Sequence, residues 1–241
     1  MFAEDETELL MAGIQGAAEL ERMVAERCSG TPLEHVLGWA DFAGVRVSVT
    51  PGVFVPRPRS ELLVDCAVEA LRPGDTVIDL CCGTGAIGVA ISARIAGLAL
   101  HACDVDPAAV GCARRNVEPL GGHVHLGDLD APLPPALRGQ ARLVVANAPY
   151  VPTDAIPLLP HEARDHEPTV ALDGGRDGLD LHRRIARLAP RWLTPGGYLL
   201  IETSEDQSEG TAALMAGTGF AVTIVQSAEH DATVVLGVAR Y

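Results

Sequence analysis

The segment with the most specific chemistry is Asn147-Ala148-Pro149-Tyr150, which directly follows the apolar run RLVVA. A side-chain carbonyl and the next backbone carbonyl, stiffened by a proline, offer two hydrogen-bond acceptors at a fixed spacing. Such a pair can hold a planar NH2 group with its lone pair facing an electrophile. The ring of Tyr150 offers a flat face for a planar amide or base. We therefore predict Asn147 and Tyr150 as catalytic residues and Ala148 and Pro149 as substrate-binding residues, although such a segment can also be an ordinary turn.

A glycine-rich loop, Cys81-Cys82-Gly83-Thr84-Gly85, separates an apolar run from a helical stretch. With Gly88 it matches the pattern G-x-G-x-x-G, and Asp104 ends the next apolar run. Glycines let a backbone approach a ligand closely, and a carboxylate can accept two hydrogen bonds from a ribose diol. NAD and S-adenosylmethionine both carry such a diol. The loop alone therefore does not separate them, and an NAD-dependent dehydrogenase stays an alternative.

Three acids end successive apolar runs: Asp79, Asp104 and Asp128. Asp79 suits an ammonium group and would repel a pyrophosphate, and Asp128 is placed to accept from an adenine amino group. Aspartates at strand ends more often cap the following helix, but three of them at the edge where doubly wound sheets bind ligands favour S-adenosylmethionine. The predicted cofactor-binding residues are Asp79, Cys81, Cys82, Gly83, Thr84, Gly85, Asp104, Asp128, Leu129 and Asn147.

Short apolar runs alternate with helical stretches from residue 75 onward. This order predicts an α/β fold with a doubly wound, Rossmann-like sheet of seven strands, mostly parallel and covered on both faces. The last two runs are too close for a crossover helix, so they should pair antiparallel. The stretch 149–178 has no clear period and predicts a binding loop. The predicted strands are 76–80, 98–103, 123–126, 142–147, 197–203, 220–225 and 233–239, and the predicted helices are 84–96, 107–117, 178–191 and 206–217.

The residues before position 75 predict a smaller N-terminal part that consists of helices and a hairpin. Residues 5–28 carry apolar side chains at helical spacing, among them Leu10, Ile14 and Met23, and suit one or two amphipathic helices. Residues 44–55 alternate in hydrophobicity and predict a hairpin or bent strand with its turn at 50–52. Ser60 is a candidate cap for a helix that runs to about residue 71.

The composition excludes several classes of function. The chain has 241 residues with 18 basic and 32 acidic side chains, a net charge of −14, and every basic residue is arginine. The absence of lysine excludes Schiff-base enzymes, Walker A phosphate loops and protein kinases, and the negative charge argues against duplex nucleic acid as a partner. Cysteines without C-x-x-C spacing predict free thiols in a reducing compartment. The sequence shows no signal peptide and no apolar run long enough to span a membrane, which predicts a cytoplasmic protein without membrane contact. His123 and His125 have no third ligand nearby, so no metal site is predicted.

Several blocks of the sequence resemble, in the same order, the HemK-like protein N(5)-glutamine methyltransferases. Asn147-Ala148-Pro149-Tyr150 stands where that family has Asn-Pro-Pro-Tyr, and residues 79–85 stand at its cofactor loop. The other matching blocks are 32–38, 41–44, 55–61, Glu167-Pro168, 171–175, 177–180, Ile201-Glu202 and Gln207.

The resemblance implies a methyltransferase that uses S-adenosylmethionine and acts on the side-chain amide of a glutamine in a protein, either a peptide-chain release factor or a ribosomal protein. It implies that Asn147 and the carbonyl of Ala148 orient the acceptor nitrogen, and that Arg57 and Glu167 bind substrate at the mouth of the site. It also implies three parts: a shortened helical segment over 1–40, a β-hairpin linker over 41–58 and a methyltransferase domain over 59–241.

The chain departs from the family pattern at several points. Cys81 replaces a glycine, which predicts that the backbone there does not use a positive φ. Ala148 replaces a proline, Arg59 replaces an acid, and the helical segment before the hairpin is shorter than the family's. These departures predict a divergent or paralogous member. Two alternatives stay open: an amino-methyltransferase that acts on a nucleic-acid base, and a catalytically impaired paralogue that only binds the cofactor.

Overall fold

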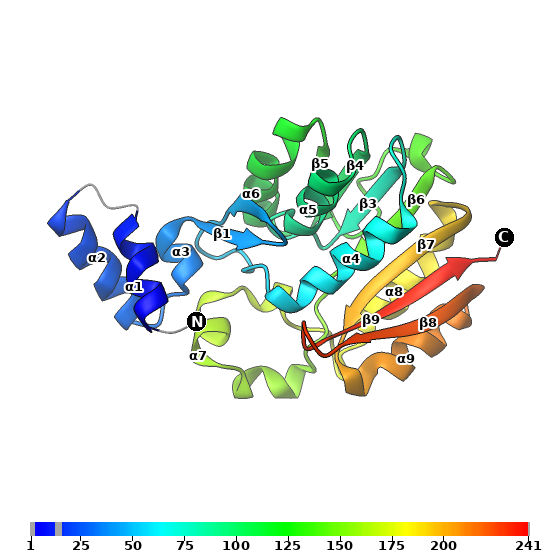
Figure 1. Cartoon of the computed structure of the whole chain (residues 1–241). Helices are drawn as coiled ribbons and strands as arrows, with labels where there is room; N and C mark the ends of the chain where they lie inside the picture. Colours follow the sequence, from blue (N-terminus) through cyan, green and yellow to red (C-terminus); the bar gives the residue numbers. More distant parts are fainter. Residues whose placement is uncertain (1–2, 13–15, 241) are drawn as a thin grey trace.

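A mixed sheet forms the centre of the fold (Figure 1). The structure is a computed structural model that describes residues 3–12 and 16–240. Within those ranges the sheet has seven strands in the order β5-β4-β3-β6-β7-β9-β8. The strands are β3 (Thr76–Leu80), β4 (Ala99–Asp104), β5 (His123–Leu126), β6 (Ala141–Ala146), β7 (Leu193–Thr203), β8 (Phe220–Ser227) and β9 (Ala232–Ala239).

The strand directions confirm the predicted doubly wound fold with an antiparallel end. Strand β3 is parallel to β4 and β6, β4 is parallel to β5, and β6 is parallel to β7. Strand β9 lies between β7 and β8 and is antiparallel to both. The chain runs outward from β3 on one side and returns to β6 on the other, so the strand order reverses at β3. A crevice for ligands is expected at the carboxyl ends of the strands at this point.

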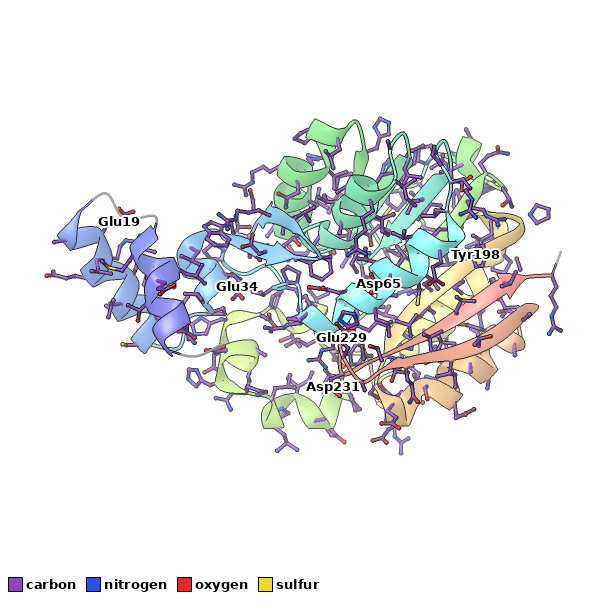
Figure 2. All side chains as sticks on the ribbon, in the orientation of Figure 1. Glu19, Glu34, Asp65, Tyr198, Glu229 and Asp231 are labelled. Atoms are coloured by element: carbon purple, nitrogen blue, oxygen red, sulfur yellow. The ribbon has the colours of Figure 1, made fainter. Side chains whose placement is uncertain are left out.

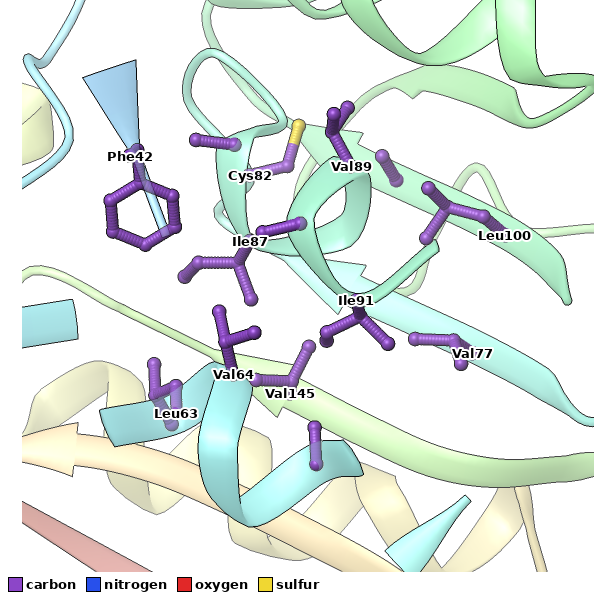
Figure 3. Packing of buried hydrophobic residues seen from close by; sticks show 14 of the residues in the cluster. Phe42, Leu63, Val64, Val77, Cys82, Ile87, Val89, Ile91, Leu100 and Val145 are labelled. Atoms are coloured by element: carbon purple, nitrogen blue, oxygen red, sulfur yellow. The ribbon is translucent and has the colours of Figure 1, made fainter. Parts of the chain in front are cut away.

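Helices cover both faces of the sheet (Figure 1). Val77 points to one face, where it belongs to the same cluster as Ile91 (Figure 3). Ile78 points to the other face, in a cluster with Ile185 and Met215. Successive side chains of a strand alternate between faces, so both faces of these buried strands are apolar. The first face carries α4 (Glu61–Ala70), α5 (Ala86–Arg94) and α6 (Pro107–Val117), and the second carries α8 (Asp180–Leu188) and α9 (Glu205–Ala216).

The N-terminal helices form a small unit at one end of the molecule (Figure 1). Leu10, Met23, Leu33 and Val36 make a separate apolar cluster there, whereas Ile14 lies outside the described residues. The helices are α1 (Ala3–Ala12), α2 (Ala17–Cys28) and α3 (Leu33–Leu37). The division of the chain at residues 40 and 58 stays a prediction.

The front hairpin lies earlier in the chain than predicted. A turn does lie at residues 50–52, closed by the Val53 N–H and the Thr50 carbonyl at 3.1 Å, but it does not join the two strands of the hairpin. Strand β1 (Trp39–Phe42) pairs with β2 (Val45–Ser48), so the predicted position of the hairpin is wrong. The hairpin turn is formed by Ala43 and Gly44, with φ values of 48° and 84°. A tight two-residue hairpin turn needs positive φ at both positions, and an alanine gives no sequence signal for that conformation. Phe42 enters the same core cluster as Ile87 of α5 (Figure 3).

The irregular stretch 149–178 contains short helices that its sequence did not predict. These are η4 (Thr153–Leu158), α7 (His161–His166) and η5 (Thr169–Ala171). The remaining short helices are η1 (Pro58–Ser60), η2 (Glu118–Leu120), η3 (Pro135–Leu137) and η6 (Ala189–Arg191). None of the helices in the described ranges is long and apolar enough to cross a membrane.

The C-terminal hairpin is tied to α4, the helix that begins next to the acceptor segment. Figure 2 shows Asp65 on α4 close to the β8–β9 turn, which carries Glu229 and Asp231. Asp65 Oδ2 lies 3.3 Å from Nε2 of His230 in that turn. This contact therefore joins the middle of α4 to the C-terminal hairpin.

Candidate active site

A cavity of about 1040 Å³ opens at the carboxyl ends of the central strands. It brings together most of the residues predicted for the two binding sites. The predicted cofactor-binding residues that line the cavity are Cys81, Cys82, Gly83, Thr84, Asp104, Asp128, Leu129 and Asn147. The predicted substrate-binding residues that line it are Arg57, Asn147, Ala148, Pro149, Tyr150 and Glu167. Asp79 and Gly85 do not line it.

The glycine loop is fixed by the carboxylate at the end of the neighbouring strand. The backbone N–H of Gly83 donates to Asp104 Oδ2 at 2.8 Å, and that of Asp106 donates to Asp104 Oδ1 at 2.9 Å. Burial raises the pKa of Asp104, and these two hydrogen bonds oppose the shift. A carboxylate oxygen can accept more than one hydrogen bond. Asp104 therefore positions the loop and can still accept hydroxyl groups from a ligand in the cavity.

Asp79 lies beneath the loop and not in the cavity. Its side chain is fully buried, and its Oδ2 accepts a hydrogen bond from the N–H of Gly88 at 3.1 Å. Its Oδ1 has no hydrogen-bond partner among the described residues. Burial raises the pKa of Asp79 to about 7. The geometry does not support direct ligand contact, and Asp79 instead holds the first turn of α5.

Asp128 is already paired in the structure. Its Oδ2 accepts a hydrogen bond from Arg184 of α8 at 2.7 Å, and both side chains line the cavity. The sequence predicts Asp128 as a contact of the adenine amino group. The structure adds Arg184 to this wall of the cavity. Its guanidinium offsets the charge of Asp128 there.

The acceptor segment is joined to the start of α4. Nδ2 of Asn147 donates to Oγ of Ser60 at 3.0 Å. The prediction that Ser60 caps α4 is wrong, because its side chain makes no capping hydrogen bond and its backbone is helical, with φ −71° and ψ −7°. A capping residue needs an extended backbone for its side chain to reach back to the helix. Ser60 is 2% exposed and lines the cavity.

Glu202 is a cavity residue for which no role was predicted. It lies at the carboxyl end of β7, is 1% exposed and accepts a hydrogen bond from the hydroxyl of Tyr150 at 3.4 Å. Burial raises the pKa of Glu202, while the hydroxyl of Ser60, the charge of Arg59 and the hydroxyl of Tyr150 oppose the shift. Burial also raises the pKa of Tyr150, to about 12. The position of Glu202 at the end of an apolar strand is the signal that could have found it.

The backbone around Tyr150 is held by the glycine-containing part of the long loop. The N–H of Val151 donates to the carbonyl of Leu172 at 3.0 Å, and the N–H of Gly174 donates to the carbonyl of Val151 at 2.8 Å. Nε2 of Gln207 donates to the carbonyl of Tyr150 at 2.9 Å. A Cβ on Gly178 would collide with that same carbonyl oxygen. The long loop therefore fixes the acceptor segment by close backbone packing.

Arg57 and Glu167 bind one another at the cavity wall. Arg57 Nη2 lies 2.6 Å from Glu167 Oε1, which also accepts the N–H of Val55 at 3.2 Å. Burial raises the pKa of Glu167, and Arg57 opposes the shift. The pair joins the segment before α4 to the end of α7. The two charges offset one another, so a structural role accompanies the predicted contact with substrate, and Glu167 Oε2 has no hydrogen-bond partner among the described residues.

The comparisons with known proteins agree with this geometry. Residues 44–157 match the methyltransferase small domain family. The release factor glutamine methyltransferase of Streptomyces coelicolor is 42% identical over 190 residues, which cover 77% of this chain and 67% of that protein. The protein of the same name from Mycolicibacterium smegmatis is 39% identical and covers 91% of this chain and 77% of its own length. This chain belongs to the release factor glutamine methyltransferase family.

Solved structures support the fold of this family member. The 16S rRNA N2 G1207 methyltransferase of T. thermophilus aligns with a TM-score of 0.61 at 20% identity, over 84% of this chain and 50% of that one. A methyltransferase from Pyrococcus furiosus aligns with a TM-score of 0.60 at 17% identity, over 81% and 89% of the two chains. At these identities the likeness concerns the fold alone.

The departures from the family pattern are accommodated within the cavity wall. Cys81 adopts φ 56°, so the expectation that a side chain excludes the positive-φ backbone is wrong. A non-glycine residue in this region costs about 1–2 kcal/mol, which the surrounding hydrogen bonds of the loop must offset. Ala148 is buried, and its carbonyl receives no hydrogen bond from the described residues. Arg59 lines the cavity, where its positive charge lowers the pKa of Glu202.

Proposed function

We propose that this chain transfers a methyl group from S-adenosylmethionine to the side-chain amide nitrogen of a glutamine in a peptide-chain release factor. The observation that carries the proposal is that one cavity is lined by the glycine loop, by Asp104 and by Asn147-Ala148-Pro149-Tyr150. The proposed donor site and acceptor site therefore share one cavity. Family membership supplies the class of protein substrate.

The residues on the donor side fit S-adenosylmethionine. Gly83 has φ 54° and nothing within 4 Å of its Cβ position, so its backbone is open to a ligand. Asp104 has fixed oxygens that can accept from a ribose diol, and Asp128 and Leu129 form the wall beyond it. When bound, S-adenosylmethionine supplies an electrophilic methyl group on a positively charged sulfur. A cavity of about 1040 Å³ is large enough for a ligand of this size together with a glutamine side chain.

The residues on the acceptor side fit a primary amide. An amide nitrogen is a weak nucleophile because its lone pair is delocalised into the carbonyl. Asn147 Oδ1 and the carbonyl of Ala148 accept no hydrogen bonds from the described residues, so both can receive the two N–H groups of a glutamine amide. Holding those N–H groups turns the nitrogen lone pair toward the donor side. Because the electrophile already carries a positive charge, orientation is the main task and no strong general base is required.

The test uses the full chain, labelled methyl donor, and either a purified bacterial release factor or bulk cellular RNA. We expect label in the release factor and none in the RNA. Asn147→Ala should abolish transfer while leaving donor affinity within about tenfold, a change of roughly 1.4 kcal/mol. Gln140→Ala, which removes an exposed amide side chain outside the cavity, is the matched control.

The other outcomes are equally informative. Label in RNA alone would replace the proposal with nucleic-acid base methylation. Donor binding without transfer to any glutamine of the release factor would support a cofactor-binding paralogue instead.

A further inference from the structure

An arginine of α8 reaches the wall of the cavity and binds one of the strand-end acids there. Arg184 Nη2 donates to Asp128 Oδ2 at 2.7 Å, and both side chains line the cavity. The two side chains are 47% and 58% exposed, and an ion pair with this much exposure adds little to the stability of a fold. A role of the pair is therefore to be sought in the cavity.

Both side chains start from backbone that is anchored in one apolar cluster. Leu129, which follows Asp128, is 5% exposed, and Ile185, which follows Arg184, is fully buried. Leu129 and Ile185 belong to the same cluster on one face of the sheet. Close packing of these neighbours limits the movement of the backbone on either side of the pair. The contact therefore joins two fixed positions, one just after β5 and one on α8.

Asp128 differs from the other two strand-end acids in what holds its carboxylate. Backbone N–H groups donate to the carboxylates of Asp79 and Asp104. Within the described part of the chain, the hydrogen-bond donor to the carboxylate of Asp128 is Arg184 alone, and it takes Oδ2. The orientation of this carboxylate therefore depends on Arg184, and its Oδ1 stays free to accept a hydrogen bond from a ligand.

A carboxylate with one oxygen held and one oxygen free can distinguish two kinds of purine. The exocyclic amino group of adenine donates hydrogen bonds, whereas the exocyclic oxygen of hypoxanthine accepts them. An ionised carboxylate only accepts. A polar group that loses its partner in a binding site lowers affinity strongly, and more so where the site cannot adjust. A fixed Oδ1 is therefore expected to favour an amino purine over a keto purine.

We propose that Arg184 is a positioning residue for the methyl donor, because it holds Oδ2 of Asp128 and leaves Oδ1 for the amino group of the adenine. The inference rests on the proposed function, since it takes S-adenosylmethionine as the donor. It deepens the donor site by naming the pair of side chains that selects the base. The selection depends on a contact between residues that lie 56 positions apart in the chain.

Calorimetry with two ligands tests this role without a protein substrate. S-adenosylhomocysteine and S-inosylhomocysteine differ only at the purine edge that carries the amino group or the oxygen. The readout is the ratio of their Kd values, since the fraction of folded protein and the contacts to the ribose and the amino acid are the same for both. The wild type should bind the adenosyl compound at least about tenfold more tightly. In Arg184→Ala this preference should fall below about threefold, and Arg184→Lys, which keeps the charge, should retain more of it.

Replacing Asp128 gives a second, opposite expectation. In Asp128→Asn the guanidinium of Arg184, which only donates, takes the amide oxygen and leaves the NH2 group for the base. This variant should bind the inosyl compound at least as tightly as the adenosyl compound. In the double variant Arg184→Ala with Asp128→Asn the amide can turn either way, so the two affinities should become nearly equal.

Arg187→Ala is the matched control for the loss of an arginine from α8. Arg187 is exposed on the same helix, makes no ion pair with any residue that the structure describes, and does not line the cavity. This variant should keep the wild-type preference. Equal affinity of the wild type for the two ligands would overturn the inference, and so would a preference in Arg184→Ala as large as that of the wild type.

The ligand preference separates this inference from the proposed function. If the wild type prefers the adenosyl compound through Arg184 but leaves a release factor unmethylated, the proposed substrate is wrong and the inference stands. If the wild type methylates a release factor but binds the two compounds equally, the inference is wrong and the proposed function stands.

Discussion

The N–H of Gly83 donates to Asp104 Oδ2 across 2.8 Å, so the acid at the end of β4 holds the glycine loop at the end of β3. One carboxylate thereby shapes the loop and faces the cavity. This relationship joins two features that the sequence shows only as separate motifs. It also predicts that loop geometry and donor binding depend on the same side chain.

Replacing Asp104 should weaken donor binding strongly. Asp104→Ala removes the acceptor for Gly83 and Asp106 and leaves the ligand hydroxyl groups without partners. We expect the Kd for S-adenosylmethionine to rise by at least about tenfold, or roughly 1.4 kcal/mol, measured by calorimetry. Asp154→Ala, at an exposed aspartate outside the cavity, should leave the Kd unchanged. Equal Kd values for wild type and Asp104→Ala would remove Asp104 from the donor site.

Gly178 should be required for the geometry of the acceptor segment. Gly178→Ala places a methyl group against the Tyr150 carbonyl and Gln207 Nε2 at a residue with φ 75°. We expect loss of most methyl transfer with near wild-type donor affinity. Gly139→Ala is the matched control, because Gly139 has φ 66° but nothing within 4 Å of its Cβ position. It should cost only the backbone strain of about 1 kcal/mol in urea unfolding and keep activity. Full activity of Gly178→Ala would show that this contact does not position Tyr150.

Asp79 should make stability depend on pH. Its pKa is raised to about 7 by burial, from an ordinary value of 3.8. Between these values the folded chain holds more protons at Asp79 than the unfolded chain, so its contribution to the free energy of unfolding falls as pH rises from about 4 to about 7.

The matched variant for this effect is Asp79→Asn, which keeps an acceptor for Gly88. Its stability relative to the wild type should increase over the same pH range, measured by urea unfolding at several pH values. Parallel stability curves for the two proteins would show that Asp79 does not titrate in this way. Taking the difference between the two proteins removes the effect of the other buried acids.

The cysteines should differ widely in reactivity. Cys28 is exposed, whereas Cys66, Cys82 and Cys103 are buried. Burial raises the pKa of Cys66 to about 11 and also raises that of Cys82 and Cys103. Because the thiolate is the reactive form, iodoacetamide near neutral pH should modify Cys28 well before the buried thiols. Peptide mapping of the alkylated chain checks this order, and equal labelling of Cys82 and Cys28 would contradict it.

Much of the fold could be predicted because the spacing of apolar residues along the chain indicates which side chains are buried. The bounds of β3, β5 and α6 agree with the predicted ranges 76–80, 123–126 and 107–117. The front hairpin could not be placed, because its turn uses Ala43 at φ 48°. An alanine in that conformation depends on the packing of both strands and leaves no pattern in the sequence.

The position of Asp104 and Asn147 in the cavity could be predicted because each is a polar residue at the end of a strand, while their roles stay predictions. The prediction from sequence failed where the role of a residue depends on a partner far along the chain. Ser60 resembles a helix cap locally, yet its side chain meets Asn147, 87 positions away. Glu202 likewise meets Tyr150, which lies 52 positions away in the chain. Asp79 was predicted to contact the cofactor because it lies near a strand end. In the structure its side chain does not line the cavity and instead accepts a hydrogen bond from the N–H of Gly88.

Tandem mass spectrometry of a release factor after incubation with this chain and S-adenosylmethionine is the decisive measurement for the proposed methyl transfer. We expect one added methyl group on the side-chain nitrogen of a glutamine with the wild type and with Gln140→Ala, and none with Asn147→Ala. A release factor without a methylated glutamine, or one methylated equally by Asn147→Ala, would contradict it.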